Sequence, residues 1–147
     1  MKKLLLILLS FPAWAEDPVT CLATNIYFEA RGEPTAGQLA VGFVVLNRAK
    51  SKKYPNTICG VVYQAKYLHK VPIRHKCQFS WYCDGELEVI REEEAYEKAE
   101  NLARYLIQGF PIDITDGSLF YHSRAVDPWW NKSVDKTIVI GNHIFYK

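Results

Sequence analysis

The chain has 147 residues, 49% of them hydrophobic and 14% aromatic, which suits one globular domain with a sizeable core. It carries 18 basic and 16 acidic side chains, a formal net charge of +2. Without Lys2 and Lys3, which lie in an expected leader, the balance is 18 − 2 = 16 basic against 16 acidic side chains. A chain without a basic excess has no charged stripe to displace counterions from phosphates, so we exclude nucleic acid as a partner.

The first fifteen residues, MKKLLLILLSFPAWA, have the pattern of a secretory signal peptide. Two lysines precede an apolar run at 4–11, and Ala13-Trp14-Ala15 forms an A-x-A cleavage site. The run is too short to span a bilayer, so we expect no stable membrane insertion after cleavage. The sequence therefore predicts a signal peptide at 1–15 and one secreted domain at 16–147; a retained anchor is the alternative.

The cysteines all follow this leader, which predicts two disulfides in an oxidising compartment. Three pairings are possible. We favour Cys77–Cys83, which brackets the short loop QFSWY, and this leaves Cys21–Cys59. An alternative is a zinc site made by the histidines and cysteines of residues 69–83. That segment lacks the usual C-x2-C or H-x3-H unit, so we predict no metal.

Two helices are predicted in the first third of the domain. Apolar residues recur at four-residue spacing over 18–30, and Gly32 and Pro34 stop this helix. Thr35 is expected to open the second helix, with Gln38 as its capping-box partner. This helix is apolar almost all round at 39–46, which predicts a buried central helix.

The rest of the chain changes from helix to strand. Residues 91–108 form an amphipathic helix closed by Gly109 and Pro111. SLFYHS and TIVIGNHIFYK are rich in strand formers, and Gly141-Asn142 is typical of a hairpin turn. The segment ICGVVYQ is left unassigned. Helices followed by short strands predict an α+β domain.

Glu29 is the first candidate for chemistry because it follows Ile26, Tyr27 and Phe28 just before a helix breaks. A carboxyl that is partly desolvated has a raised pKa and keeps a proton near neutral pH. A general acid that acts on a glycosidic oxygen needs such a proton. Glu33 lies beyond Gly32 and on local grounds is a cap or a partner of Arg31.

Several ordered motifs resemble the SleB/CwlJ-type cell-wall hydrolase family. They are YFEARGEPTAGQLAVGFVVLNRAKSKKYPNTICGVVYQ, QFS at 78–80, GSLFYHS at 117–123, DPWW at 127–130 and IGNHIFYK at the end. The resemblance implies a lysozyme-like, lytic-transglycosylase-type fold with a glycan cleft between the helical and β-rich parts. It implies cleavage of peptidoglycan glycan strands in the periplasm or cell wall, without a cofactor.

The resemblance also assigns roles to single residues. The single catalytic acid of the family matches Glu29. The residues implied to bind substrate are Gln78, Phe79, Ser80, Tyr121, His122, Glu33 and Trp130, several of which could instead be structural. The stretch AKYLHKVPIRHKC departs from the family by being long and basic, and it is expected to form a surface excursion.

Three functions stay open at this level. The first is a lytic transglycosylase that cuts between N-acetylmuramic acid and N-acetylglucosamine and leaves 1,6-anhydromuramyl ends. The second is a true N-acetylmuramidase, which would need a second carboxylate. The third is a non-catalytic peptidoglycan-binding module. Retention of Glu29 favours an enzyme, because a binding module has no need for a protonated carboxyl.

Overall fold

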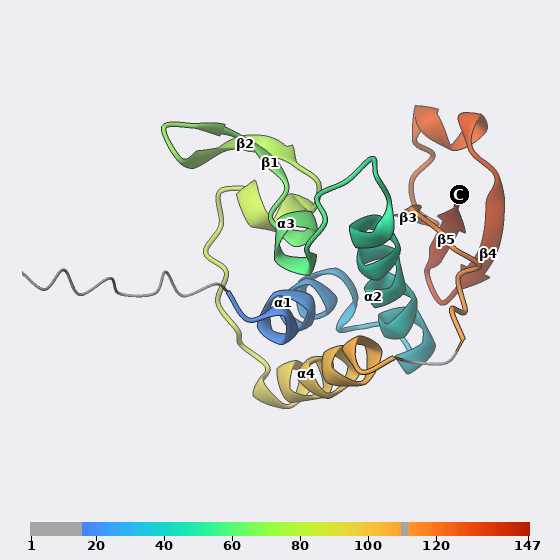
Figure 1. The fold of residues 1–147 in the computed structure, drawn as a ribbon, viewed down its shortest axis with the longest axis horizontal. Helices are drawn as coiled ribbons and strands as arrows, with labels where there is room; N and C mark the ends of the chain where they lie inside the picture. The colour runs from blue at the N-terminus through green and yellow to red at the C-terminus, as the bar shows by residue number, and fades with distance from the viewer. Residues whose placement is uncertain (1–15, 110–111) are drawn as a thin grey trace, which may run out of the picture.

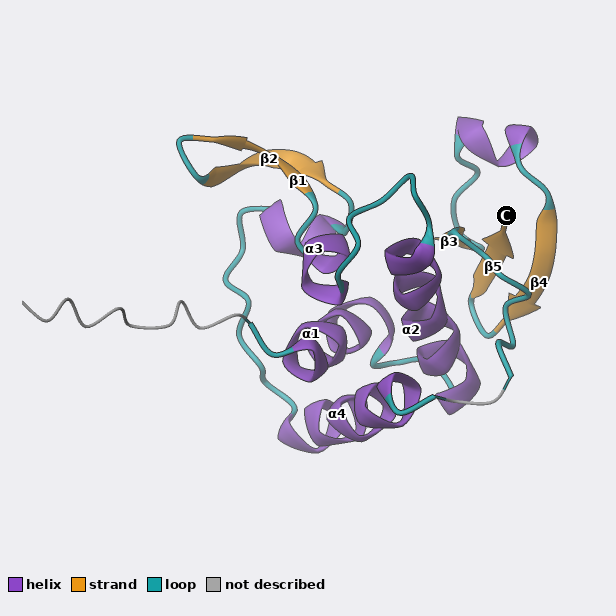
Figure 2. Cartoon of the chain, viewed as in Figure 1, coloured by secondary structure: helices purple, strands orange, loops and turns teal. Residues whose placement is uncertain are grey.

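The computed structural model describes residues 16–109 and 112–147, so the predicted signal peptide lies outside the described residues. Helices α1, α2, α3 and α4 pack together, a two-stranded hairpin projects from one side, and a separate small sheet covers α2 (Figure 1). The predicted α+β class is confirmed (Figure 2). Within the described ranges, the helices are too short or too polar to cross a membrane.

Helix α1, Pro18–Ala30, matches the predicted range. It begins where it does because the Asp17 carboxylate accepts hydrogen bonds from the amides of Val19 and Thr20, and because proline fits the first helical position. Its residues Leu22 and Ile26 are fully buried in the core. The helix therefore has one end fixed by a cap and one face fixed by packing, which holds its last turn in place.

Helix α2, Thr35–Lys50, is the central helix that the sequence predicted. It packs against α1, α3 and α4, and Gly42 allows the Leu106 side chain of α4 to approach its backbone closely. The expected capping box is wrong. Thr35 is already helical, and the Gln38 side-chain amide donates to the carbonyls of Arg31 and Glu33 at 3.2 and 3.1 Å. Gln38 thus ties the α1–α2 turn rather than the helix start.

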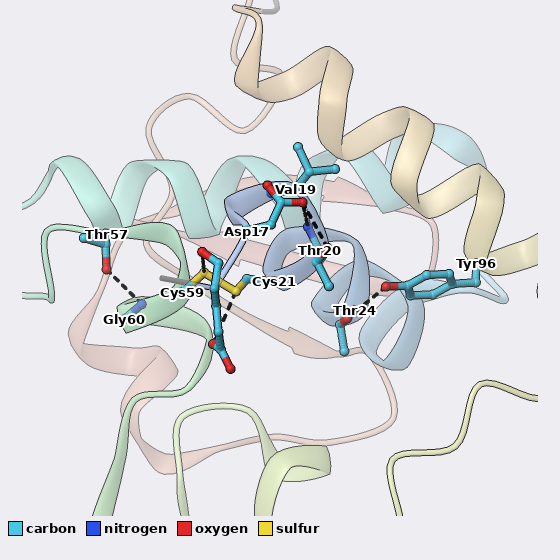
Figure 3. The surroundings of a disulfide bond; sticks show 10 residues. Asp17, Val19, Thr20, Cys21, Thr24, Thr57, Cys59, Gly60 and Tyr96 are labelled. Atoms are coloured by element: carbon cyan, nitrogen blue, oxygen red, sulfur yellow. Dashed lines mark hydrogen bonds between the residues drawn. A yellow bond between two sulfur atoms is a disulfide. The ribbon is translucent and has the colours of Figure 1, made fainter. Parts of the chain in front are cut away.

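Helix α3, Ile58–Val62, is the segment that the sequence left unassigned, being too short to show a period. The Thr57 hydroxyl caps it by accepting from the Gly60 amide at 3.0 Å. The predicted Cys21–Cys59 disulfide is confirmed and joins α1 to α3 (Figure 3). A disulfide that closes a loop of this length commonly stabilises a fold by about 2–4 kcal/mol.

Helix α4, Glu93–Ile107, lies within the predicted range and buries Ala99, Ala103 and Leu106. Ile107, in the last turn, is 38% exposed. On the side facing α1, the Tyr96 hydroxyl lies 3.3 Å from the Thr24 hydroxyl (Figure 3). α4 therefore supports α1 from below, on the side opposite the hairpin of Figure 1.

The basic surface excursion is a β-hairpin formed by β1, Ala65–Leu68, and β2, Val71–Cys77. Its turn residues His69 and Lys70 have positive φ values of 47° and 67°. The predicted Cys77–Cys83 disulfide is confirmed, and it anchors the end of β2 to the 3-10 helix η1, Ser80–Cys83. The sulfur atoms of Cys77 and Cys83 are bonded to each other, so neither is available as a thiolate ligand for zinc.

The β-rich part is an antiparallel sheet in the order β3-β5-β4. Its strands are β3, Phe120–Ser123, β4, Lys136–Ile140, and β5, His143–Tyr146. The predicted hairpin at Gly141-Asn142 is confirmed, with Gly141 at φ 58°. A 3-10 helix η2, Trp129–Ser133, connects β3 to β4. Phe145 of β5 packs with Ala40 and Val44 of α2, which attaches the sheet to the helices.

Candidate active site

A cavity of about 190 Å³ opens where the end of α1, the last turns of α2, the start of η1 and strand β3 meet. It lies between the helical and β-rich parts, as the sequence led us to expect. It contains one carboxylate, one guanidinium, one phenol and an amide. The lining residues are Glu29, Arg48, Cys77, Gln78, Phe79, Ser80 and Tyr121.

Glu29 is half-buried in the wall of this cavity, one residue before α1 ends. The Tyr121 hydroxyl donates a hydrogen bond to its Oε2 at 2.5 Å. Burial raises the pKa of the Glu29 carboxyl, and the Tyr121 hydrogen bond and the positive charge of Arg48 offset only part of that rise. The result is an acid that holds its proton to higher pH than an exposed glutamate.

Arg48 is a residue that the sequence did not single out for the site. It is buried, its Nε donates to the Leu119 carbonyl at 2.8 Å, and its guanidinium lies over the rings of Tyr54 and Phe79 at 5.1 and 5.3 Å. Among the described residues its Nη1 has no hydrogen-bond partner. The available signal was an arginine that directly follows the apolar stretch of a central helix, where a charge needs specific partners.

The QFS motif forms the opposite wall. Phe79 is buried beneath Arg48, whereas Gln78 and Ser80 are exposed at the cavity. The bond between Cys77 and Cys83 fixes both ends of this segment. An amide and a hydroxyl held rigidly beside an acid can bind the hydroxyl and acetamido groups of a sugar.

The structure places Glu33, His122 and Trp130 outside the lining of this cavity. The Glu33 carboxylate accepts a hydrogen bond from the Asn142 amide at 2.8 Å and thereby holds the β4–β5 turn; Arg31 instead pairs with Glu92 at 3.0 Å, not with Glu33. Their expected roles in substrate binding stay predictions.

His122 and Trp130 belong to an aromatic cluster on the other face of the sheet. His122 Nε2 lies 2.8 Å from the Tyr146 hydroxyl, and its ring packs edge-on against Trp130. Successive residues of a strand point to opposite faces, so the neighbours Tyr121 and His122 cannot both face the cavity. Trp129 is 84% exposed and makes no part of the cavity lining.

No second carboxylate lines the cavity among the described residues. Burial alone would raise the pKa of Asp113. The hydrogen bonds that it accepts from Thr115, Asn47 and Gly117 outweigh this effect, and the pKa is lowered. Asp116 pairs with Lys147, and Asp84 accepts from the Glu86 amide. Each of these acids is therefore engaged in local structure.

A family model described as Cell Wall Hydrolase matches residues 32–146, which is more than half of the chain. The chain belongs to the cell wall hydrolase family. The matched range starts three residues after Glu29 and does not include it. Glu29 is a candidate acid because of its burial, its raised pKa and its hydrogen bond with Tyr121.

The relatives of this chain include spore cortex-lytic enzymes from two Bacillus species. The one from Bacillus cereus is 31% identical over 137 residues, covering 91% of this chain and 46% of the relative. The one from Bacillus subtilis is 32% identical over 135 residues, covering 90% and 38%. This cell wall hydrolase therefore spans less than half the length of both relatives.

Solved structures of the same family share the fold. The catalytic domain of the germination-specific lytic transglycosylase SleB from Bacillus anthracis superposes with a TM-score of 0.70 at 28% identity, covering 93% of this chain and 99% of that one. The catalytic domain of the Bacillus cereus SleB protein gives a TM-score of 0.62 at 27% identity, covering 93% and 94%. The expected lysozyme-like α+β fold is confirmed.

Proposed function

We propose that this cell wall hydrolase cleaves the glycan strand of peptidoglycan as a lytic transglycosylase, with Glu29 as its general acid and base. The observation that carries the proposal is a carboxyl with a raised pKa, the one carboxyl among the described residues that line the cavity, beside the side-chain amide of Gln78 and the hydroxyl of Ser80. Its relatives, which include a spore cortex-lytic enzyme and a lytic transglycosylase, support the same reaction class.

In this mechanism the Glu29 carboxyl donates its proton to the glycosidic oxygen as the bond from C1 of N-acetylmuramic acid to that oxygen breaks. The resulting carboxylate then accepts the proton of the 6-hydroxyl of the same sugar while O6 bonds to C1. No water is consumed, and Glu29 ends protonated as it began. The attack is intramolecular and gains from proximity.

Tyr121 and Arg48 fit the first half of this cycle, in which Glu29 becomes a carboxylate. Both stabilise the carboxylate form of Glu29, the one by its hydrogen bond and the other by its charge. Without them burial alone would hold the proton too tightly for its transfer to the glycosidic oxygen. Gln78 and Ser80 are proposed to hold the sugar, with Phe79 supporting them and the Arg48 guanidinium from below.

We further propose that the enzyme works outside the cytoplasm, in the periplasm or at the cell wall. The signal-like residues 1–15 support export, and so do two disulfides, which persist in oxidising compartments.

The decisive test is Glu29→Gln, which keeps shape but removes the transferable proton. Release of soluble fragments from purified sacculi should fall by about a hundredfold or more. Glu97→Gln, an exposed change on α4, is the matched control and should leave the rate unchanged. Equal cleavage by Glu29→Gln and the wild type would overturn the assignment of Glu29 as the acid, and no release of fragments by the wild type would leave a glycan-binding module.

A further inference from the structure

A second pocket, of about 270 Å³, adjoins the catalytic cavity. The two share Cys77 and Gln78 as a common wall. The backbone amide of Gln78 donates to the backbone carbonyl of Gln64 at 2.9 Å, so the start of the hairpin is tied directly to the QFS segment. A group that leaves the cavity past Gln78 therefore enters this pocket.

The adjoining pocket is lined by two lysines, Lys66 of β1 and Lys76 of β2. Both are exposed, and neither forms an ion pair; in the part of the chain that the structure describes, the ion pairs are Arg31–Glu92 and Lys147–Asp116. The hairpin at 65–77 contains no acidic residue. Gln64 also lines this pocket, and its buried Oε1 has no hydrogen-bond partner among the described residues.

Unpaired cations beside a polar pocket point to an anionic ligand. In peptidoglycan the anions attached to the strand are the carboxylates of the peptide stem, which starts from the lactyl group on C3 of N-acetylmuramic acid. C3 belongs to the same ring as the reacting C1, so a sugar in the cavity carries its stem to the cavity edge. The covalent link supplies the carboxylate at high effective concentration, which a separate phosphate polymer lacks.

We propose that Lys66 and Lys76 form a stem subsite, which binds a carboxylate of the peptide stem on the muramyl sugar being cut. This inference rests on the proposed function, which places the muramyl sugar being cut in the catalytic cavity. It makes the enzyme selective for stem-bearing over stem-free glycan.

The test uses Glu29→Gln protein, which leaves its ligand intact, and soluble glycan strands. One portion of strands keeps its stems. In the other, an N-acetylmuramoyl-L-alanine amidase has hydrolysed the amide between the lactyl group and the stem, which removes the stem carboxylates and leaves only the shorter lactyl carboxylate on the sugar. Titration calorimetry should show tighter binding to stem-bearing strands. Adding Lys66→Gln and Lys76→Gln should weaken that binding about threefold to tenfold, since each exposed charge pair is weak, and bring the ratio of the two affinities towards one.

Lys70→Asn is the matched control, because Lys70 lies at the tip of the same hairpin outside the pocket and asparagine tolerates its positive φ. It should leave the affinity ratio unchanged. Equal affinity of the parent protein for both strands, or an unchanged ratio after both lysine substitutions, would overturn the subsite. Tighter, lysine-dependent binding to a stem-free teichoic acid would also overturn it, in favour of a phosphate site.

The binding and cleavage measurements test the subsite and the proposed function independently. If the wild type cuts neither kind of strand but the lysine-dependent ratio holds, the proposed function is wrong and the subsite stands on a binding module. If the wild type cuts both strands equally well and the ratio is one, the proposed function stands and the subsite is wrong.

Discussion

The Tyr121 hydroxyl donates to Glu29 Oε2 at 2.5 Å, and this contact joins the helical part to the β-rich part across 92 residues of sequence. Burial also raises the pKa of Tyr121 well above its usual value, so the phenol stays a donor throughout the working pH range. One hydrogen bond thus orients the acid and tunes its proton affinity at the same time.

Tyr121→Phe should shift the pH dependence of cleavage. The hydrogen bond favours the charged carboxylate, so its removal raises the pKa of Glu29 further. The alkaline limb of kcat/KM, which reports the protonated acid of the free enzyme, should move to higher pH. Activity at the optimum should fall about tenfold or more, the usual effect of losing a hydrogen bond to a charged group.

Tyr146→Phe is the matched control for this change, because its hydroxyl bonds His122 on the other face of the sheet. Its pH profile should follow the wild type. An alkaline limb that stays in place or moves to lower pH in Tyr121→Phe would show that Glu29 is not the titrating acid.

Glu29→Gln should also change how stability depends on pH. The folded chain holds the Glu29 proton more tightly than the unfolded chain, whose carboxyl titrates near the ordinary value of 4.5. Between the unfolded and the folded pKa values, the unfolded state therefore binds fewer protons than the folded state. Over this window the free energy of unfolding of the wild type declines as the pH rises. Glutamine has no such loss, so the variant should gain stability relative to the wild type with rising pH.

Urea denaturation at about pH 4 and about pH 8 measures this difference. The stability gap, variant minus wild type, should be larger at the higher pH, and Glu97→Gln should show no such trend, since that side chain is exposed. A gap that shrinks with rising pH would mean that the folded state favours the carboxylate.

The sequence predicted those parts of the fold that local signals determine. Pro18 and the break at Gly32 and Pro34 bound α1, and the apolar run of α2 marks a helix that must be surrounded. The hairpin at 65–77 escaped assignment because VPIRHK does not alternate between apolar and polar residues, and its turn, His69-Lys70, lacks the usual Asn-Gly. Five-residue α3 is too short for a period.

The site was harder to predict because it depends on contacts between distant segments. Family resemblance brought Glu29 and Tyr121 into one list, but no spacing rule predicts their contact. Arg48 lacked a motif of its own, and its role follows only from where α2 places it. His122 directly follows Tyr121 in a predicted strand, and successive strand residues point to opposite faces of a sheet. The two side chains therefore cannot both face one cavity.

Glu33→Ala should act on stability rather than on chemistry. Its half-exposed carboxylate holds the Asn142 amide at 2.8 Å, so truncation should lower the free energy of unfolding by about 1–2 kcal/mol, less than a fully buried charged hydrogen bond. Glu33→Gln keeps an acceptor and should lose less, with cleavage within a few-fold of the wild type. A large loss of cleavage at unchanged stability would instead place Glu33 in the substrate site.

The product separates a transglycosylase from a true muramidase. Hydrolysis by a glycosidase normally needs two carboxylates that flank the bond, one to donate a proton and one to act as nucleophile or to activate water. In the part of the chain that the structure describes, Glu29 is the lone carboxylate in the lining of the cavity, and Asp113 is held by Thr115, Asn47 and Gly117. We therefore expect 1,6-anhydro-N-acetylmuramyl ends, formed by the sugar's own 6-hydroxyl.

Mass spectrometry of fragments from digested sacculi distinguishes the two products, because an anhydro end is lighter than a reducing end by one water. Digestion in water enriched in oxygen-18 adds an independent readout. A transglycosylase incorporates no label at the muramyl end, whereas a hydrolase places it on C1. Reducing muramyl ends that carry the label would mean that water attacks C1. Some group other than Glu29 would then have to activate that water, and Asp113, a partly buried carboxylate with a lowered pKa, would be the first residue to substitute.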